Sequence, residues 1–132
     1  MFWKKNNNDD YSTPFEYLSI IDKFIPQGSN ICDPFYNDGL VVEEWKKLNR
    51  DIIHVNSDFF QSEYDCDTFV SNPPFSIINK VLKKLFEIDK SFALLIPIQK
   101  ICQLKVQKII KNKNIQIVIC NIYIGFLKNG KR

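Results

Sequence analysis

Short apolar runs alternate with amphipathic stretches along almost the whole chain, and this alternation limits the folds open to it. The strand-like runs cover residues 30–33, 51–55, 69–71 and 91–97. Helical patterns of apolar residues lie between and around them, starting near residues 13, 40, 76 and 98. Strands that alternate with helices predict an α/β fold with a mostly parallel sheet, flanking helices and a ligand site at the carboxyl ends of the strands.

Capping signals mark where two of these helices begin. Thr13 is the predicted N-cap of the first helix, Pro14 suits its first position, and Glu16 completes a capping box. One face of this helix is apolar: Phe15, Leu18, Ile21, Phe24 and Ile25. Ser76 is the predicted cap of a later helix whose lysines face solvent: Lys80, Lys83 and Lys84.

The last third of the chain carries three further predictions. The run 91–97 is apolar, as in a strand that a parallel sheet buries on both faces. Residues 98–111 have the pattern of one lysine-bearing helix. Residues 115–126 predict β structure with a break near Asn121.

With 132 residues, the chain has room for one domain and one core. We expect residues 1–10 to be a flexible segment and residues 11–132 to be a single domain without a separate target-recognition domain. No run of about 18 apolar residues is present, and the first residues lack a signal-peptide pattern. We therefore expect an intracellular protein, cytoplasmic or nuclear, that is not secreted and has no membrane partner.

The cysteines and the single histidine argue against a metal site. Four cysteines are widely scattered and form no Cys-x-x-Cys pair, which favours buried free thiols over disulfides. His54 is the only histidine and lies in a short apolar strand pattern, so we expect it to have a structural role. The prediction is that no metal is bound.

Charge is distributed unevenly along the chain. Residues 1–75 contain 6 Lys and Arg against 13 Asp and Glu, whereas residues 76–132 contain 12 against 2. A basic half beside an acidic half suggests a polyanionic partner such as nucleic acid. The alternative is that the many Lys, Asn and Ile residues reflect an A/T-rich genome, so charge alone does not decide the partner.

Asn72-Pro73-Pro74-Phe75 follows a predicted strand, and this pattern has chemical consequences. Two successive prolines can neither donate to a β ladder nor sit inside a helix, so the chain turns there. The Asn72 side-chain oxygen and the Pro73 carbonyl can then accept both hydrogens of a planar amine, whose lone pair becomes nucleophilic as the nitrogen turns tetrahedral. Phe75 offers a face on which a base can stack. The structural alternative is a turn that merely ends a strand.

A second loop, from Asp33 to Gly39, follows another strand end, and the two loops together resemble a known family. They are similar to the S-adenosylmethionine-dependent methyltransferases that modify the N6 amine of adenine, in particular the phage and algal-virus type. Asn72-Pro73-Pro74-Phe75 resembles the catalytic motif, and Asp33-Pro34-Phe35 through Gly39 resembles the cofactor loop, Asp-Pro-Phe-x-Gly-x-Gly. The similarity spans about residues 11–131 and includes further segments in order: Thr13-Pro14, Asp58-Phe59-Phe60, Leu94-Leu95-Ile96-Pro97, Ile124-Gly125-Phe126 and Asn129-Gly130-Lys131.

The resemblance implies a shortened Rossmann-like class I methyltransferase fold. Its activity would be transfer of a methyl group from S-adenosyl-L-methionine to the N6 amine of adenine in nucleic acid, with DNA favoured over RNA. It implies cofactor-binding roles for Thr13, Pro14, Asp33, Pro34, Phe35, Gly39, Asp58 and Phe59. It implies catalytic roles, acting on the target amine and on a flipped base, for Asn72, Pro73, Pro74 and Phe75.

The chain departs from the family pattern in three places. Asn37 stands where the first loop glycine is usual, and Asn tolerates a left-handed φ better than most residues. Val55 and Asn56 follow the strand that usually ends in an acidic ribose-binding residue, and the chain then continues as though a helix and a strand were missing. After Asn129-Gly130, a hairpin signal, no returning strand follows, which would leave a sheet edge open.

These departures leave alternatives to an active DNA methyltransferase. One is a degenerate relative that binds nucleic acid or a partner subunit without catalysis. The other is the same chemistry applied to RNA or to a protein glutamine, because related enzymes use the same motif on other amines. Target selection would come from the lysine-rich face of the chain, from a second copy in a homodimer, or from a partner subunit.

Overall fold

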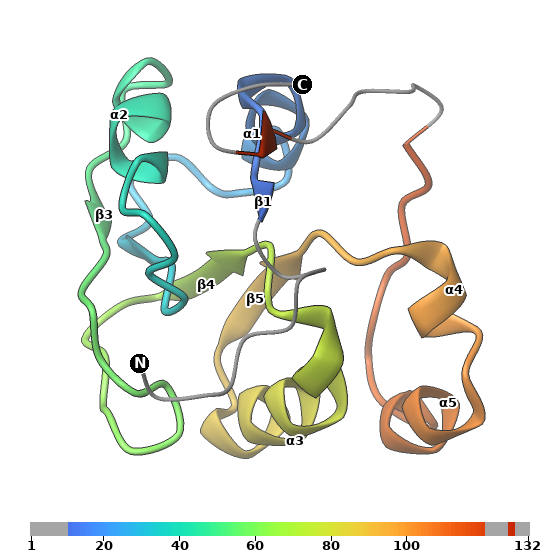
Figure 1. Ribbon diagram of the computed structural model, residues 1–132. Helices are drawn as coiled ribbons and strands as arrows, with labels where there is room; N and C mark the ends of the chain where they lie inside the picture. Colours follow the sequence, from blue (N-terminus) through green and yellow to red (C-terminus); the bar gives the residue numbers. More distant parts are fainter. Residues whose placement is uncertain (1–10, 121–126, 129–132) are drawn as a thin grey trace.

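The computed structural model describes residues 11–120 and 127–128. Its centre is a four-stranded sheet in the order β3-β2-β4-β5, with every neighbouring pair parallel (Figure 1). The expected α/β arrangement with a parallel sheet is therefore confirmed. The strands are short: β2 Ile31–Cys32, β3 Ile52–Ile53, β4 Thr68–Ser71 and β5 Ser91–Leu94.

Helices surround this sheet, and a separate pair of short strands lies beside it. The helices are α1 Phe15–Asp22, α2 Val41–Lys46, the 3₁₀ helix η2 Phe75–Ile77, α3 Ile78–Ile88, α4 Ile98–Ile101 and α5 Leu104–Ile110. The separate pair is antiparallel and joins β1 (Tyr11–Ser12) to β6 (Leu127–Lys128). This pairing brings the two ends of the described chain together.

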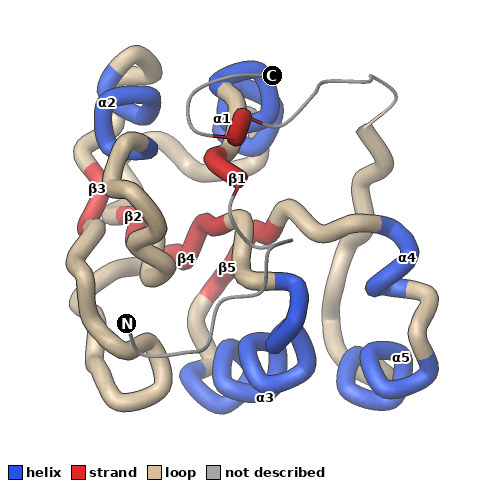
Figure 2. The backbone as a smooth tube through the Cα atoms, in the orientation of Figure 1, coloured by secondary structure: helices blue, strands red, loops and turns tan. Residues whose placement is uncertain are grey.

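Side chains alternate across the central sheet and so contribute to two different cores. Cys32 and Phe69 belong to the core that includes residues of α3 and α5. Ile31 and Val70 belong to the core that includes residues of α1 and α2. The alternation is the period of two that a strand imposes on its side chains. Figure 2 shows the consequence, with α1 and α2 on one side of the strands and α3 and α5 on the other.

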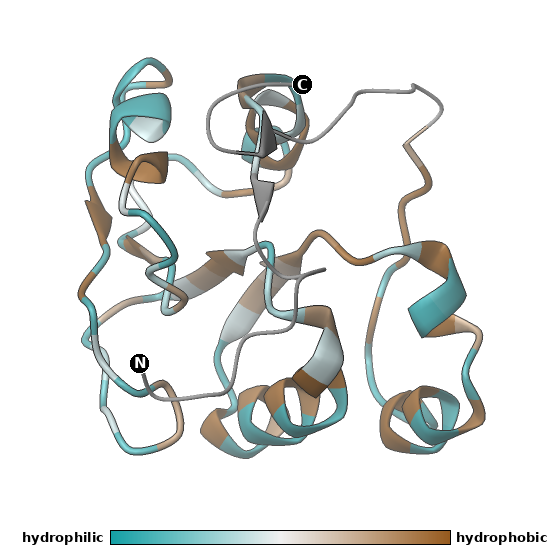
Figure 3. Ribbon diagram, viewed as in Figure 1, coloured by the Kyte–Doolittle hydropathy of each residue, from teal (hydrophilic) through white to brown (hydrophobic). Residues whose placement is uncertain are grey.

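Apolar residues lie mainly on the inner sides of these elements. Figure 3 shows β3 and β4 largely in brown, while the helices are brown along only part of their circumference. On α3 the buried residues follow helical spacing: Ile78, Val81, Leu82 and Leu85. None of the helices in the described part of the chain is long and apolar enough to span a membrane.

Arg50 joins the end of α1 to the turn before β3. Its buried guanidinium donates from Nε to Asp22 Oδ1 at 2.6 Å. Its terminal nitrogens donate to the carbonyl oxygens of Ile25 and Pro26 at 3.0 and 3.1 Å. These bonds give the two carbonyl oxygens just beyond α1 a donor. They also pair the buried guanidinium with the Asp22 carboxylate, and an unpaired buried charge would be costly.

Both predicted N-caps are wrong. At α1 the N-cap is Pro14 and not Thr13, because the Pro14 backbone is extended, with ψ of 148°. At α3 the N-cap is Ile77, because Ser76 lies inside the 3₁₀ helix η2 that precedes it. The two helices are present where predicted, and only their first turns differ.

Two side chains do not face the way the helical pattern predicts. Phe24 lies two residues beyond the end of α1 and is 55% exposed. Lys84 on α3 turns inward, because its Nζ donates to the Phe59 carbonyl oxygen at 2.6 Å and lies 5.1 Å from the centroid of the Phe59 ring. Lys80 and Lys83 are exposed, as predicted.

The last third of the chain departs most from its pattern. β5 is an edge strand with partly exposed side chains and is not buried on both faces. The predicted helix over residues 98–111 is two helices, α4 and α5, because Gln103 between them has an extended backbone with ψ of 139°. Residues 115–120 form no strand. The rest of that predicted β run, the segment 1–10 and the Asn129-Gly130 signal lie outside the described residues.

All four cysteines are free thiols, as expected. Cys32 and Cys66 are buried, and burial raises the pKa of both thiols. Cys102 is exposed and Cys120 is half-buried, so the prediction that the thiols are buried is wrong for Cys102. Its position directly after α4, on the surface, accounts for the difference.

Candidate functional site

The loops that follow β2 and β4 diverge at the centre of the sheet. From β2 the chain runs through α2 to β3 on one side, and it then returns to β4 on the other side of β2. Parallel α/β sheets bind ligands at such a reversal, in the crevice beyond the carboxyl ends of the strands. Asp33 directly follows β2 and Asn72 directly follows β4, so the two candidate motifs meet there.

The Asp33 side chain connects the ends of these two strands. Its Oδ1 accepts a hydrogen bond from Ser71 Oγ at 2.7 Å and another from the Phe35 N–H at 3.1 Å. Burial raises the pKa of Asp33 to about 6, against the lowering effects of the nearby His54 and of these two hydrogen bonds. This carboxyl group, only 7% exposed, therefore ionises at a higher pH than an exposed aspartate does.

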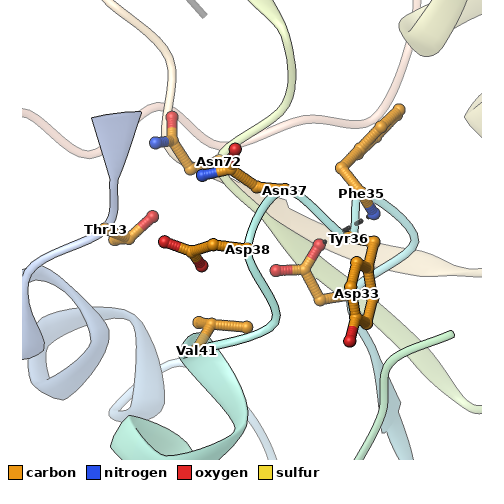
Figure 4. Close-up of a pocket in the computed structure, with 8 residues that line it drawn as sticks. All are labelled: Thr13, Asp33, Phe35, Tyr36, Asn37, Asp38, Val41 and Asn72. Carbon is orange, nitrogen blue, oxygen red and sulfur yellow. Dashed lines mark hydrogen bonds between the residues drawn. The ribbon is translucent and has the colours of Figure 1, made fainter. Parts of the chain in front are cut away.

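A pocket opens beside Asp33, as Figure 4 shows. The pocket is open to solvent and is lined by Thr13, Asp33, Phe35, Tyr36, Asn37, Asp38, Val41 and Asn72. The lining comes from the segment before α1, the loop after β2 with the start of α2, and the loop after β4. Carboxylate, amide and hydroxyl oxygens make this lining rich in hydrogen-bond acceptors.

The structure brings only part of the predicted site into this pocket. The predicted residues that line it are Thr13, Asp33, Phe35 and Asn72. Pro14 and Pro34 are fully buried next to two of them in the chain. Neither of these prolines lines the pocket, and the other predicted residues that do not line it are Gly39, Asp58, Phe59, Pro73, Pro74 and Phe75.

Left-handed backbone shapes the loop after β2. Asn37 has a φ of 46°, so the residue that replaces the family's first loop glycine does adopt the left-handed conformation. Gly39 has a φ of 77°, and a Cβ added there would lie 2.7 Å from Tyr36 Oη. Glycine is thus required at position 39 both by the backbone and by the Tyr36 ring.

His54 holds this loop from the end of β3. Its ring nitrogens lie 2.8 Å from the Asp33 carbonyl oxygen and 3.1 Å from the Tyr36 carbonyl oxygen. The imidazole also stacks on the Tyr36 ring, with 4.9 Å between centroids. His54 lies just after β3 and not within a strand as its pattern predicted, and its ring packs against the pocket loop.

The loop after β4 is rigid but leaves one acceptor unpaired. Pro73 and Pro74 are buried, and the Pro74 carbonyl accepts the Ile77 N–H at 3.2 Å, which starts η2. Asn72 Oδ1 is buried and has no hydrogen-bond partner among the described residues. Leaving such an atom unpaired costs about 1–3 kcal/mol. A ligand that donates a hydrogen bond to it would remove that cost.

Asp58 and Phe59 lie apart from the pocket. Asp58 Oδ1 accepts the Phe60 N–H at 2.9 Å, which closes a turn after β3. The Phe59 side chain is 0% exposed and packs against Phe35 and Phe69 with ring centroids 5.1 and 6.0 Å away. A ring buried on all sides has no free face for an adenine, so the cofactor role of these residues stays a prediction.

Four residues of the pocket lining had no individual role in the prediction: Tyr36, Asn37, Asp38 and Val41. The first three lie in the segment that resembles the cofactor loop, whereas Val41 begins α2. His54 directly follows β3 at the same edge of the sheet, and this position is the signal that could have found it. No group of three or more His, Cys, Asp or Glu residues within the described ranges is arranged to hold a metal.

The chain was also compared with known proteins. No protein-family model, curated protein or solved structure matches the chain. The chemistry of the site is therefore argued from its own geometry. That geometry provides a buried carboxyl group, an amide oxygen without a partner among the described residues, and a proline turn at one end of a parallel sheet.

Proposed function

We propose that this chain transfers a methyl group from S-adenosyl-L-methionine to the N6 amine of adenine in nucleic acid, with DNA favoured over RNA. It would do so as a shortened class I methyltransferase domain. The observation that carries the proposal is that Asp33 and Asn72, from two separate sequence motifs, line one pocket. Their strands, β2 and β4, are neighbours, and the bond from Ser71 to Asp33 joins the strand ends.

The acceptor-rich lining fits one end of the cofactor. S-adenosylmethionine carries a cationic sulfonium and a cationic ammonium group at its methionine end. Asp33 and Asp38 provide carboxylates in the pocket. Asp33 is buried and Asp38 is exposed, so the stronger attraction for a cation is expected at Asp33, where burial lowers the dielectric constant. The adenine end has less support, because Phe59 has no exposed face in this structure.

The residues of the β4 loop supply positioning for the target. When bound, the cofactor provides an electrophilic methyl group. Asn72 Oδ1, which has no partner among the described residues, and the Pro73 carbonyl would accept the two hydrogens of the target amine and orient its lone pair. Phe75, partly exposed at the start of η2, would stack on the base. Positioning of this kind replaces a general base at the moment of attack.

Exposed lysines support a nucleic acid as the substrate. α3 follows the Asn72–Phe75 loop after the single turn η2, so its positive charges continue from the site. Contacts between lysines and phosphates give binding that weakens as salt is added. The exposed lysines of α3, of α5 and of the segment after α5 are Lys80, Lys83, Lys105, Lys108, Lys111 and Lys113.

A methyl-transfer assay tests the proposal. The chain is given methyl-labelled S-adenosylmethionine with DNA, RNA and protein offered side by side. The expected result is label on the N6 amine of adenine in DNA, lost in Asn72→Ala. Label on RNA or on a protein glutamine instead would overturn the choice of substrate. Absence of transfer to all three by a chain that binds the cofactor would overturn the reaction.

One observation favours a second candidate, binding of nucleic acid or a partner subunit without catalysis. His54, Val55 and Asn56 follow β3, where an acidic residue would hold the cofactor ribose, and Phe59 is buried. The adenosine half of the cofactor thus lacks the expected partners. This candidate predicts binding of DNA with no saturable binding of S-adenosylmethionine, and a calorimetric titration with the cofactor separates the two.

A further inference from the structure

His54 faces two hydrogen-bond acceptors at once. Its Nδ1 lies 2.8 Å from the carbonyl oxygen of Asp33, and its Nε2 lies 3.1 Å from the carbonyl oxygen of Tyr36. Carbonyl oxygens only accept hydrogen bonds, and a neutral imidazole has a single N–H. Both contacts are hydrogen bonds at the same time only when the ring is an imidazolium with two N–H groups.

The packing around the ring suits a positive charge. The Tyr36 ring stacks on the imidazole at 4.9 Å between centroids, with 21° between the planes. Aromatic faces attract cations placed over them. The stack depends on Gly39, since a Cβ there would lie 2.7 Å from Tyr36 Oη. The His54 ring, the Tyr36 ring and Gly39 therefore pack together beside the pocket.

The same charge acts on the Asp33 carboxyl group. Positive charge on His54 lowers the pKa of Asp33 and opposes the burial that raises it. Burial raises the pKa of the Cys32 thiol, so that this neighbour stays neutral and adds no charge. From β4, Ser71 contributes a hydroxyl that donates and does not titrate in this range. The titratable groups around Asp33 are His54 after β3, Cys32 on β2, and Tyr36 and Asp38 on the pocket loop.

We propose that His54 is a positioning residue, which as the imidazolium fixes the loop from Asp33 to Tyr36 and keeps the Asp33 carboxylate charged for a cationic ligand. It does not line the pocket itself and acts through Asp33 and Tyr36. The proposal rests on the proposed function only in naming S-adenosylmethionine as the cationic ligand. In this proposal the residue that follows β3 fixes the pocket loop and does not bind the cofactor ribose.

Nitrogen-15 NMR of the histidine ring is the first test, and it needs no cofactor. His54 is the only histidine in the chain, so its two ring signals are unambiguous. In the folded chain, under the conditions used for cofactor binding, both nitrogens should carry protons and show the shifts of an imidazolium. A neutral ring with one unprotonated nitrogen would overturn the proposal, whether or not the chain binds the cofactor.

The second test compares cofactor binding in His54→Phe and in the matched control Val55→Ala. Phenylalanine keeps a ring to stack on Tyr36 but has no donor and no charge, whereas Val55 is 56% exposed and next in the chain. The expected loss in His54→Phe is about ten- to hundredfold in affinity, the effect of one hydrogen bond from a charged group. Val55→Ala should bind as the wild type does.

The pH dependence of binding distinguishes positioning from simple structural support. Without the charge on His54, the pKa of Asp33 rises, so binding in His54→Phe should reach its plateau at a higher pH than in the wild type. A loss of affinity with an unchanged pH profile would overturn the role in keeping Asp33 charged. If the wild type binds no cofactor, the proposed function fails, while the NMR test still decides the state of His54.

Discussion

Two loops leave the same edge of the sheet, yet they use their polar groups in opposite ways. In the loop after β2, Asp33 accepts two hydrogen bonds, and two of the loop's carbonyls face His54. In the loop after β4, Asn72 Oδ1 is buried without a partner among the described residues. Prolines hold this second loop in place, so that its acceptor stays unpaired.

The difference separates a supporting loop from a reactive one. Polar groups that are already bonded fix the shape of a pocket and stabilise it. An unpaired buried acceptor destabilises the free protein and becomes favourable only with a donor ligand, which is the expected arrangement in a binding site. We therefore expect substitutions in the β2 loop to affect stability and cofactor binding, and those in the β4 loop to affect transfer.

The largest expected effect is at Asn72. Asn72→Ala should lower methyl transfer by about 10²–10³-fold, as loss of one positioned polar group at a reacting centre does. The free energy of unfolding should rise, by about 1–3 kcal/mol at most, because the substitution removes a buried acceptor that has no partner among the described residues. Transfer rates and chemical denaturation measure the two quantities.

Asn79 provides the matched control for that substitution. Its Oδ1 is also buried without a partner among the described residues, but it lies on α3 and does not line the pocket. Asn79→Ala should retain transfer. Equal losses in the two variants would show that Asn72 is a structural residue and would remove the contrast between the loops.

A pH dependence of stability is expected at Asp33. Its pKa is raised from 3.8 to about 6, so its contribution is fully present below pH 3.8 and is lost as the pH rises through 6. The loss relative to Asp33→Asn should be about 3 kcal/mol, at about 1.4 kcal/mol per pKa unit. The difference between the free energies of unfolding of the two proteins, measured by denaturation at several pH values between 3 and 8, tests this prediction. A difference that does not vary with pH would contradict the buried carboxylate.

Phe75→Ala tests the division of labour within the β4 loop. Loss of one stacking face should weaken use of the nucleic acid by about 1–3 kcal/mol. Cofactor affinity should change less, because Phe75 does not line the pocket beside Asp33. The Michaelis constant for DNA and the dissociation constant for the cofactor are compared in the same variant. A larger effect on cofactor affinity than on use of the nucleic acid would mean that the nucleic-acid and cofactor parts of the site have been assigned the wrong way round.

The smallest expected effect is at Gly39 in the β2 loop, and Gly28, which lies between α1 and β2, is its control. Gly39 and Gly28 have nearly equal φ values, 77° and 79°, so alanine at either position should cost about 1–2 kcal/mol of backbone strain. Only at Gly39 does the new Cβ meet another group, Tyr36, whereas nothing lies within 4 Å at Gly28. Gly39→Ala should therefore lose more stability, and it alone should weaken cofactor binding. Equal losses in thermal denaturation would show that Tyr36 moves aside freely.

The sequence was most informative where local chemistry restricts the backbone. Pro73 and Pro74 can neither pair in a sheet nor continue a helix, and the chain turns there. Asn37 adopts the left-handed φ that its side chain tolerates. The alternation of apolar runs and helical patterns correctly predicted a parallel sheet with helices on both faces.

Prediction failed where tertiary contacts decide the outcome. Lys84 turns inward because the Phe59 carbonyl and ring lie within its reach, and no pattern along α3 contains that information. His54 looked like a residue within a strand, but β3 ends at Ile53 and leaves it beside the pocket loop. Residues 115–119, apolar except for Gln116, have a strong β pattern and form no strand, because a strand needs a neighbour that sequence alone does not identify.

The most direct test of the account is to follow the backbone amide signals of the chain by NMR as S-adenosylmethionine is added. The account predicts saturable shifts in both loops, at residues 33–39 and at Asn72, with the same dissociation constant, because one pocket includes both. Absence of saturable shifts at millimolar cofactor, or shifts confined to residues away from both loops, would contradict it.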